Sequence, residues 1–277
     1  MELYGPYGIP VASKAEKESF DRANTKAMIF TRMLKDSEKV VFFGGAGVST
    51  ESGIPDFRSA TGVYSQKYGN RSPEQIVSRS FFDSFPREFY SFYREKMLFL
   101  DAKPNAAHLK LAELEKAGKD ITIVTQNIDG LHQKAGSSKV IELHGSVMRN
   151  RCMKCGQEYN VNFVANDRNP VPECSLCGGK IKPDVVLYEE SLDEKNIEAA
   201  VTAISECDML IVAGTSLVVY PAAGFIRYFR GAHSVIINLS QSGHDQFMDL
   251  AVHEKVGEFL SQIDVSECVG KKKKSAE

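Results

Sequence analysis

The sequence predicts an α/β protein in which a doubly wound, Rossmann-like parallel sheet carries a smaller lobe. Two observations support this fold class: short apolar runs alternate with segments of helical periodicity, and two longer stretches interrupt the alternation. Uninterrupted apolar strands suit a parallel sheet that is covered on both faces. Strand–helix alternation over this length is typical of doubly wound folds. The expected strands are residues 39–43, 121–125, 140–143, 184–188, 208–213 and 234–238.

Two segments between these runs have clear helical periodicity. Residues 104–117 begin with a proline and end before Gly118, as helices commonly do. Residues 192–206 show the same pattern after a capping-box start formed by Ser191 and Glu194. The apolar faces consist of Ala107, Leu111 and Leu114 in the first helix and of Ile197, Ala200, Val201 and Ile204 in the second.

The two interrupting stretches are expected to be insertions that pack together as the smaller lobe. Residues 57–103 are rich in aromatic residues and helical in character, and most of these aromatics are expected to lie in a core. Residues 147–183 contain four cysteines and are too short to build their own core, so a metal should stabilise them. We expect a single domain over residues 1–277, whose Rossmann-like core consists of about 25–56, 104–146 and 184–265.

The four cysteines of the second insertion form two Cys-x2-Cys pairs, Cys152 with Cys155 and Cys174 with Cys177. Their spacing is typical of a four-cysteine zinc site. Four thiolates close a tetrahedral site with no open position, so the predicted zinc ribbon is structural and not catalytic. Cys207 lies in an apolar context and is expected to be a small core residue.

Composition and charge exclude several broad classes. Hydrophobic residues make up 43% of the 277 residues and charged residues 25%, which is ordinary for a globular protein. The net charge of −2 argues against a general nucleic-acid binder, which would be basic. The sequence has no apolar run long enough to cross a membrane, and its N-terminus lacks the pattern of a secretory signal. We therefore expect a cytoplasmic protein, with Lys271 to Lys274 as a solvated tail.

A glycine-rich turn follows the first expected strand. Gly45, Ala46 and Gly47 would let backbone N–H groups approach a pyrophosphate at a helix start. The hydroxyl groups of Ser49 and Thr50 could donate further hydrogen bonds to a phosphate. The full G-x-G-x-x-G pattern fails at Thr50, so a plain tight turn remains an alternative on this stretch alone.

Two further strand ends support a nucleotide site. Gly214, Thr215 and Ser216 follow the strand expected at 208–213, and Asn238 ends the strand expected at 234–238. The carboxyl ends of the strands meet at one crevice in doubly wound folds, and ligands bind there. The sequence therefore predicts that three strand ends face one nucleotide.

Two polar stretches at other strand ends leave their roles open. Gln126, Asn127 and Asp129 surround Ile128, and Asn and Asp commonly hydrogen-bond their own backbone in turns. His144 follows an apolar run and precedes a glycine. A histidine at a strand end is more often structural than catalytic, yet imidazole is well suited to proton transfer near neutral pH.

Taken together, these stretches resemble the sirtuin family, the NAD-dependent protein-lysine deacylases, in its bacterial and archaeal form. The matches are GAGVSTESGIPDFRS, TQNIDGLH, HGS, both Cys-x2-Cys pairs, GTSLVVYPAA and the dipeptide IN at 237–238. They follow the order of the family and span about residues 40–240. The resemblance implies that the turn holds the NAD phosphates, while the residues after it form a loop over the nicotinamide ribose.

The resemblance also implies roles for individual residues. His144 would be the general base that takes a proton from a ribose hydroxyl. The reaction would give nicotinamide, free lysine and O-acetyl-ADP-ribose, consuming NAD as a co-substrate, and one structural Zn²⁺ would bind the cysteines. The implied NAD contacts are Ala46, Thr50, Phe57 and Arg58 around the phosphates and the covering loop, Gln126, Asn127, Ile128 and Asp129 at the nicotinamide end, and Thr215, Ser216 and Asn238 at the adenosine side.

The partners implied by the resemblance are acetylated-lysine proteins or peptides, bound between the lobes as an added strand. Val186, Tyr188 and Val219 would contact this peptide. The stretch VVLYEE departs from the family, because Tyr188 replaces a phenylalanine and Glu189 a glycine. The added charge predicts a preference for basic flanking residues. We expect no nucleic-acid or membrane partner and a monomeric enzyme.

The acyl group is expected to be acetyl or another apolar group. Sirtuins that remove succinyl groups resemble one another in a Tyr-x-x-Arg pair on the helical insertion. Here Tyr90 fills the first position, but Tyr93 fills the fourth and Arg94 follows it. One residue turns the side chain by about 100° around a helix, so Arg94 should not make the same bidentate contact with a carboxylate.

Three alternatives remain at this point. A mono-ADP-ribosyltransferase could use the same fold, and the presence of His144 argues for deacylation instead. An NAD-dependent oxidoreductase would need a hydride acceptor site and an acidic residue near the end of the second strand. A zinc-ribbon binding module for nucleic acid would need a basic, aromatic face around the cysteines, which this sequence lacks.

Overall fold

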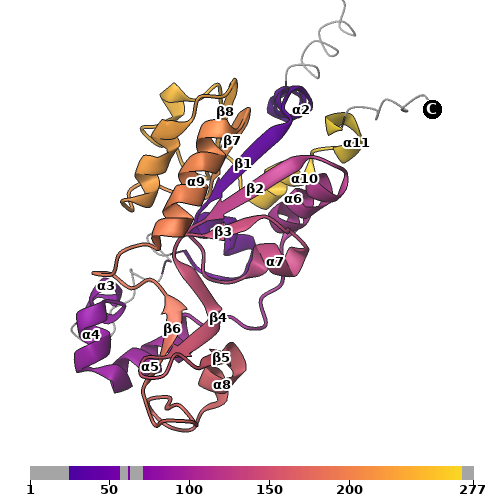
Figure 1. Ribbon diagram of the computed structural model, residues 1–277. Helices are drawn as coiled ribbons and strands as arrows, with labels where there is room; N and C mark the ends of the chain where they lie inside the picture. The colour runs from indigo at the N-terminus through magenta and orange to yellow at the C-terminus, as the bar shows by residue number, and fades with distance from the viewer. Residues whose placement is uncertain (1–24, 57–61, 63–70, 270–277) are drawn as a thin grey trace, which may run out of the picture.

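The computed structural model describes residues 25–56, 62 and 71–269, which form two lobes (Figure 1). The larger lobe contains a six-stranded sheet in the order β3-β2-β1-β7-β8-β9, in which all neighbouring strands are parallel. The strand order reverses between β1 and β7, which confirms the doubly wound topology. The strands are β1 (Lys39–Gly44), β2 (Asp120–Thr125), β3 (Val140–Glu142), β7 (Met209–Ala213), β8 (His233–Ile237) and β9 (Leu250–Val252).

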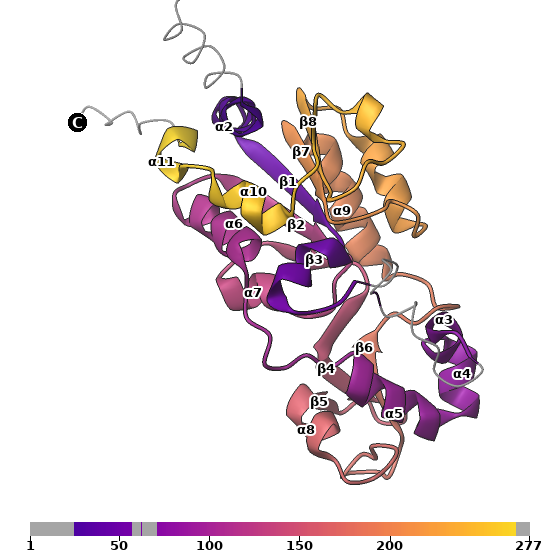
Figure 2. The ribbon, with the colours of Figure 1, turned by 180° about the vertical axis from the view of Figure 1, so that it is seen from behind.

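Helices cover both faces of this sheet, as Figures 1 and 2 show from opposite sides. Successive side chains of a strand point to opposite faces, so Val40 and Phe42 of β1 join one core while Val41 and Phe43 join the other. Burial on both faces explains why the strands are apolar without alternation. The helical elements are α2 (Lys26–Asp36), α6 (Ala106–Lys116), α10 (Val256–Ser261) and α11 (Val265–Cys268) on the first core, α9 (Glu194–Glu206) and η4 (Ala222–Tyr228) on the second, and α7 (Leu131–Ala135) beside α6.

The smaller lobe combines the two predicted insertions around one core. Its antiparallel sheet has the order β5-β4-β6. Phe82, Phe89, Tyr90 and Tyr93 from the helical insertion are fully buried there, packed with Cys152 and Ile181 of the cysteine-containing insertion. The elements are α3 (Pro73–Ile76), α4 (Arg79–Ser84), α5 (Pro86–Lys96), β4 (Gly145–Cys152), β5 (Glu158–Asn160), α8 (Val161–Asn166) and β6 (Ile181–Val185).

The prediction of a parallel-sheet strand at 184–188 is wrong, both in the bounds of the strand and in the sheet to which it belongs. The structure has β6 at Ile181–Val185, in the antiparallel sheet of the smaller lobe. Its side chains alternate between buried and more exposed positions, as in a half-covered antiparallel sheet. The sixth strand of the parallel sheet is β9, Leu250–Val252, whose three residues are too few to show a pattern.

The helix starts also differ in part from the prediction. Asp193 caps α9 by accepting a hydrogen bond from Asn196 N at 3.0 Å, so the capping box predicted at Ser191 and Glu194 is wrong. An aspartate nearer the first helical turn provides the same acceptor. The predicted apolar face of residues 104–117 is buried as expected in α6. None of the helices in the described ranges has the length and apolarity that a membrane span requires.

Candidate active site

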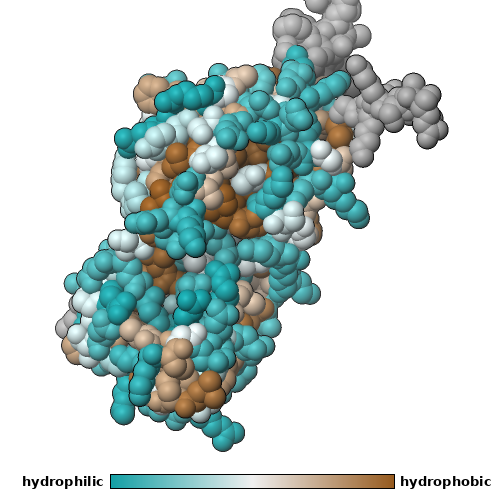
Figure 3. All heavy atoms as spheres, viewed as in Figure 1, coloured by the Kyte–Doolittle hydropathy of each residue, from teal (hydrophilic) through white to brown (hydrophobic). Residues whose placement is uncertain are grey.

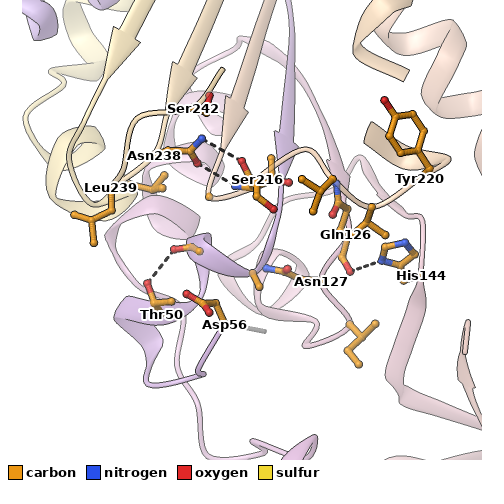
Figure 4. A pocket seen from close by; sticks show the side chains of 18 of the residues that line it. Thr50, Asp56, Gln126, Asn127, His144, Ser216, Tyr220, Asn238, Leu239 and Ser242 are labelled. Atoms are coloured by element: carbon orange, nitrogen blue, oxygen red, sulfur yellow. Dashed lines mark hydrogen bonds between the residues drawn. The ribbon is translucent and has the colours of Figure 1, made fainter. Parts of the chain in front are cut away.

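A cleft of about 1170 Å³ lies at the carboxyl ends of the parallel strands and extends toward the smaller lobe. Residues of the glycine-rich turn line one part of it, and residues after β6 line another. Figure 4 shows Thr50, Gln126, Asn127, His144, Ser216 and Asn238 around this space. The cleft therefore brings together most of the candidate residues from separate stretches of the sequence.

The glycine-rich turn is packed tightly against the loop after β7. Gly45 N donates to Ala213 O at 3.0 Å, and Gly47 N donates to Gly214 O at 2.8 Å. A Cβ atom on Gly45 would lie 2.7 Å from the Cβ of Thr215, and one on Gly47 would lie 2.8 Å from the Cα of Gly214. Only glycine permits this approach. We call this contact, at the point where the strand order reverses, the glycine cradle. The N–H groups of Gly45 and Gly47 are paired with backbone carbonyls in it, so the expectation that they approach a pyrophosphate is wrong for these two groups.

The far end of this cradle is held by Asn238. Its Oδ1 accepts a hydrogen bond from Thr215 N at 3.0 Å, and its Nδ2 donates to Thr215 O at 3.1 Å. Asn238 and Ser216 both line the cleft, and Figure 4 shows the two side by side. Asn238 therefore fixes the loop after β7 in addition to facing the space in which a ligand would lie.

A buried hydrogen-bond network lies beneath the turn. Ser49 Oγ donates to Asp129 Oδ2 at 2.6 Å, and Asn127 Nδ2 donates to Ser49 Oγ at 3.1 Å. Leu131 N donates to Asp129 Oδ1 at 2.9 Å. Ser49 is buried, so its predicted role as a phosphate donor is wrong. Gln126, Asn127 and Ile128 line the cleft, whereas Asp129 supports them from behind.

Two residues that sequence reasoning missed hold the turn from outside. Asn105 Nδ2 donates to Val48 O at 2.8 Å while Asn105 also caps α6. The Glu51 carboxylate accepts hydrogen bonds from Gly257 N at 2.6 Å and Glu258 N at 3.1 Å, at the first turn of α10. Asn105 could have been recognised from the sequence, because an asparagine just before a helix is a common N-cap. Glu51 could not, because its partner Gly257 is 206 residues away and leaves no local pattern.

His144 is oriented by the backbone of the neighbouring loop. Its Nδ1 lies 2.9 Å from Gln126 O, and since a carbonyl can only accept, Nδ1 carries the proton. Nε2 is therefore left as the acceptor. Burial lowers the pKa of His144 below its usual value, partly opposed by this hydrogen bond. The ring is neutral at pH 7 and is suited to accept a proton in the cleft.

Two further histidines form a buried pair behind the site. The rings of His108 and His132 lie 4.6 Å apart between centroids, and both are almost fully buried. Within the described residues, neither ring nitrogen of His132 has a hydrogen-bond partner. Burial lowers the pKa of His108 to about 4 and that of His132 to about 3. Both rings must therefore stay neutral in the folded protein.

This pair predicts acid sensitivity. The unfolded chain takes up protons near pH 6.5 while the folded pair does not, so stability is complete above about pH 6.5 and falls as the pH is lowered toward 4. Urea unfolding should show a loss of roughly 2 kcal/mol per histidine between pH 7 and pH 5. NMR titration of the imidazole signals provides the direct check. Protonation of His108 or His132 near pH 6.5 would contradict the expectation.

The peptide contacts predicted from the resemblance lie on two different segments that line the cleft. Val186 and Tyr188 belong to the segment after β6, and Val219 belongs to the segment after β7. Val186 N donates to His144 O at 3.0 Å, and Tyr188 N donates to Val77 O at 3.0 Å. Phe57 and Arg58 lie outside the described residues.

The four cysteines converge as predicted. Their sulfur atoms all lie within 4.8 Å of one another, with 3.5 Å between those of Cys152 and Cys177 and 3.6 Å between those of Cys155 and Cys174. Zn–S bonds of about 2.3 Å in a tetrahedron place the sulfurs about 3.8 Å apart. Tyr159 Oη also donates to Cys174 Sγ at 3.1 Å. The donor set therefore fits a structural zinc ion.

Comparison with known proteins connects this geometry to a family. The Sir2 family model matches residues 45–221. An NAD-dependent protein deacetylase of Clostridium acetobutylicum is 54% identical over 84% of this chain and 95% of its own length, and one of Cutibacterium acnes is 53% identical over 83% and 94%. A solved structure described as Sir2-p53 peptide-NAD+ is 40% identical over 86% of this chain and 97% of its own, with a TM-score of 0.76.

Proposed function

The chain belongs to the Sir2 family, and on this premise we infer that it is an NAD-dependent protein deacetylase. It removes acetyl groups from protein lysines and gives nicotinamide and O-acetyl-ADP-ribose. The observation that carries this conclusion is the position of His144, neutral, oriented by Gln126 O and facing the cleft beside the glycine cradle. The fold, the glycine cradle and the four-cysteine cluster agree with it.

The cradle accounts for how NAD would bind. Ala46 and Thr50 would lie at the phosphates, since both line the cleft beside Gly47 and Gly214. Thr215, Ser216 and Asn238 would hold the adenosine. Gln126, Asn127 and Ile128 would line the nicotinamide end, with Asp129 as their support through Ser49. Phe57 and Arg58 remain proposed as residues that cover the ribose and exclude water.

His144 would act as the general base for the ribose. Nicotinamide would leave as the acyl oxygen bonds to the NAD ribose. His144 Nε2 would then accept the proton of a neighbouring ribose hydroxyl, and that oxygen would bond to the acyl carbon. Addition of water and breakage of the bond between the acyl carbon and the lysine nitrogen would release free lysine and O-acetyl-ADP-ribose. Gln126 O would hold the proton on Nδ1 and stabilise the imidazolium that forms. The zinc ion would take no part in this chemistry, because four thiolates leave no open position.

The substrate peptide would bind as an added strand between the segment containing Val186 and Tyr188 and the segment containing Val219. A monomeric enzyme in the cytoplasm without nucleic-acid partners is part of the proposal. The net charge of −2 supports the absence of a nucleic-acid partner, and the free cysteines support the cytoplasmic location. Light scattering of the purified protein checks the monomeric state.

The deciding experiment is mass spectrometry of an acetyl-lysine peptide incubated with the protein, with and without NAD. Loss of the acetyl group only with NAD, together with O-acetyl-ADP-ribose, supports the proposal. ADP-ribose attached to protein without deacetylation would instead indicate a mono-ADP-ribosyltransferase on the same fold. Reduction of NAD, seen as absorbance at 340 nm, would indicate an oxidoreductase.

Succinyl-lysine is expected to be a poor substrate. Arg94 is the nearest candidate for binding a distal carboxylate. Its side chain instead donates to Val164 O at 3.1 Å and to Asn169 O at 3.0 Å, both in the cysteine-containing insertion. Tyr90 donates to Ile181 O and is fully buried. Neither residue lines the cleft. Desuccinylation should therefore be at least about 100-fold slower than deacetylation of the same peptide, as expected for a site that leaves a charge unpaired. Equal rates would contradict this assignment.

A further inference from the structure

Glu189 has a backbone conformation that side chains rarely adopt. Its φ is 75°, in the left-handed region that favours glycine. Such conformations persist where the surrounding contacts hold them, and they gather at ligand-binding sites. Glu189 follows β6 in the segment that passes α3 between the lobes (Figure 1). Its side chain is exposed and lines the cleft.

The carboxylate of Glu189 is fixed by neutral groups. Oε2 accepts a hydrogen bond from Ser80 N at 2.9 Å, and Oε1 accepts one from Ser80 Oγ at 2.9 Å. Both donors belong to one residue at the start of α4. Since neither donor is charged, the contacts orient the carboxylate without neutralising it.

The charges beside Glu189 are already matched. Arg79 pairs with Asp83 at 2.9 Å and with Glu190 at 2.9 Å, and Lys182 pairs with Glu190 at 3.0 Å. The two cations therefore balance the charges of two carboxylates, those of Asp83 and Glu190. Among the described residues, no cation forms an ion pair with Glu189, so its carboxylate adds one negative charge. This charge is exposed at the edge of the proposed peptide groove.

The second wall of the proposed groove, which follows β7, carries no charged side chain that could pair with Glu189. That wall consists of Val218, Val219, Tyr220 and Pro221, and Val218 and Tyr220 are largely exposed. Figure 3 shows apolar residues in brown near the waist between the two lobes, among hydrophilic ones. A peptide in the groove would therefore meet one apolar wall and one wall with a single fixed negative charge.

We propose that Glu189 is a specificity-determining residue that favours acetyl-lysine peptides with an arginine or lysine next to the acetyl-lysine. The proposal rests on the proposed function, because it assumes that the peptide lies in this groove. Opposite charges about 4 Å apart in a well-solvated site give a preference of about fivefold. Dissolved salt weakens such a preference because it screens exposed charges.

The test compares kcat/KM for acetyl-lysine peptides that differ only in one flanking residue, which is arginine, glutamine or glutamate on either side. Each peptide is measured with the unmodified enzyme, Glu189→Gln and Glu189→Gly, in low salt and in 0.5 M salt, which is roughly enough to screen exposed charges. Glu198→Gln is the matched control, since Glu198 is an exposed glutamate on α9 outside the cleft. Thermal unfolding of each variant shows whether it folds.

We expect the unmodified enzyme and Glu198→Gln to prefer the arginine peptide over the glutamate peptide on one side, and both Glu189 variants to lose that preference. For each protein, the rate on the glutamine peptide is the reference against which its rates on the arginine and glutamate peptides are compared. An unchanged preference in Glu189→Gln, or one that ignores salt, would overturn the proposal. Equal loss of activity on all peptides in Glu189→Gly alone would show that Glu189 only fixes α4. Absence of deacetylation in the unmodified enzyme would contradict the proposed function instead.

Discussion

Replacing His144 with alanine is expected to lower kcat for deacetylation by about 100- to 10,000-fold, the usual contribution of a general base. The change removes the neutral Nε2 that faces the cleft and leaves the glycine cradle and its contact with Gly214 intact. NAD should therefore still bind to the variant. Deacetylation rates from mass spectrometry and the dissociation constant for NAD from calorimetry measure the two effects separately.

A histidine at the other end of the sheet gives the matched control. His233 begins β8, whereas the cleft lies at the carboxyl ends of the strands, so His233→Ala should retain kcat. Equal kcat for His144→Ala and the unmodified enzyme would contradict the assignment of His144 as the general base. Loss of NAD binding in His144→Ala would show that its role is to hold the site together.

The pH profile gives a second view of the same residue. The base must be neutral, and burial lowers the pKa of His144 from its ordinary value. The acid limb of kcat/KM should therefore lie below about pH 6.5, the ordinary histidine pKa. The profile must be measured where the protein remains folded, because His108 and His132 destabilise it as the pH falls. An acid limb above pH 7 would contradict the assigned environment.

The parts of the site predicted from sequence are those that leave a local pattern. Glycines after a strand, cysteines in two close pairs and His144 after an apolar run are each readable within a few residues. The structure brings these stretches together in the way that a doubly wound sheet requires, because its strand order reverses between β1 and β7. The fold class follows from the same alternation of short patterns.

The contacts that sequence reasoning missed join residues far apart in the chain. Ser49 was expected to face a phosphate, but its partner is Asp129, and nothing near either residue indicates the other. The strand expected at 184–188 was assigned to the wrong sheet, because an apolar run does not indicate which strand it pairs with. The left-handed backbone of Glu189 cannot be read from the glutamate itself, because this conformation favours glycine. The family glycine that Glu189 replaces was the signal that could have indicated it.

Removal of the zinc ion is expected to unfold the smaller lobe and to abolish deacetylation. Cys152 and Cys174 belong to the same core as Phe89 and Tyr90, so loss of the metal exposes the helical insertion as well as the cysteine module. Structural zinc contributes roughly 10–16 kcal/mol in isolated zinc fingers, more than a small core of this kind supplies. The parallel sheet has two cores of its own and should retain its helices and strands.

A comparison of Cys174→Ser with Cys207→Ala distinguishes the effect of losing the zinc ion from the effect of losing any buried thiol. Cys207 lies in the core of the larger lobe, so its variant should bind zinc normally and lose little stability. The Cys174 variant should contain less than one zinc per chain by elemental analysis and show an early unfolding transition of the smaller lobe. Because Val186 N is bonded to His144 O at the junction of the lobes, that transition should remove the peptide groove and the orientation of the base together. A zinc-free Cys174→Ser protein with unchanged melting and unchanged kcat would mean that the shared aromatic core alone holds the lobe in place.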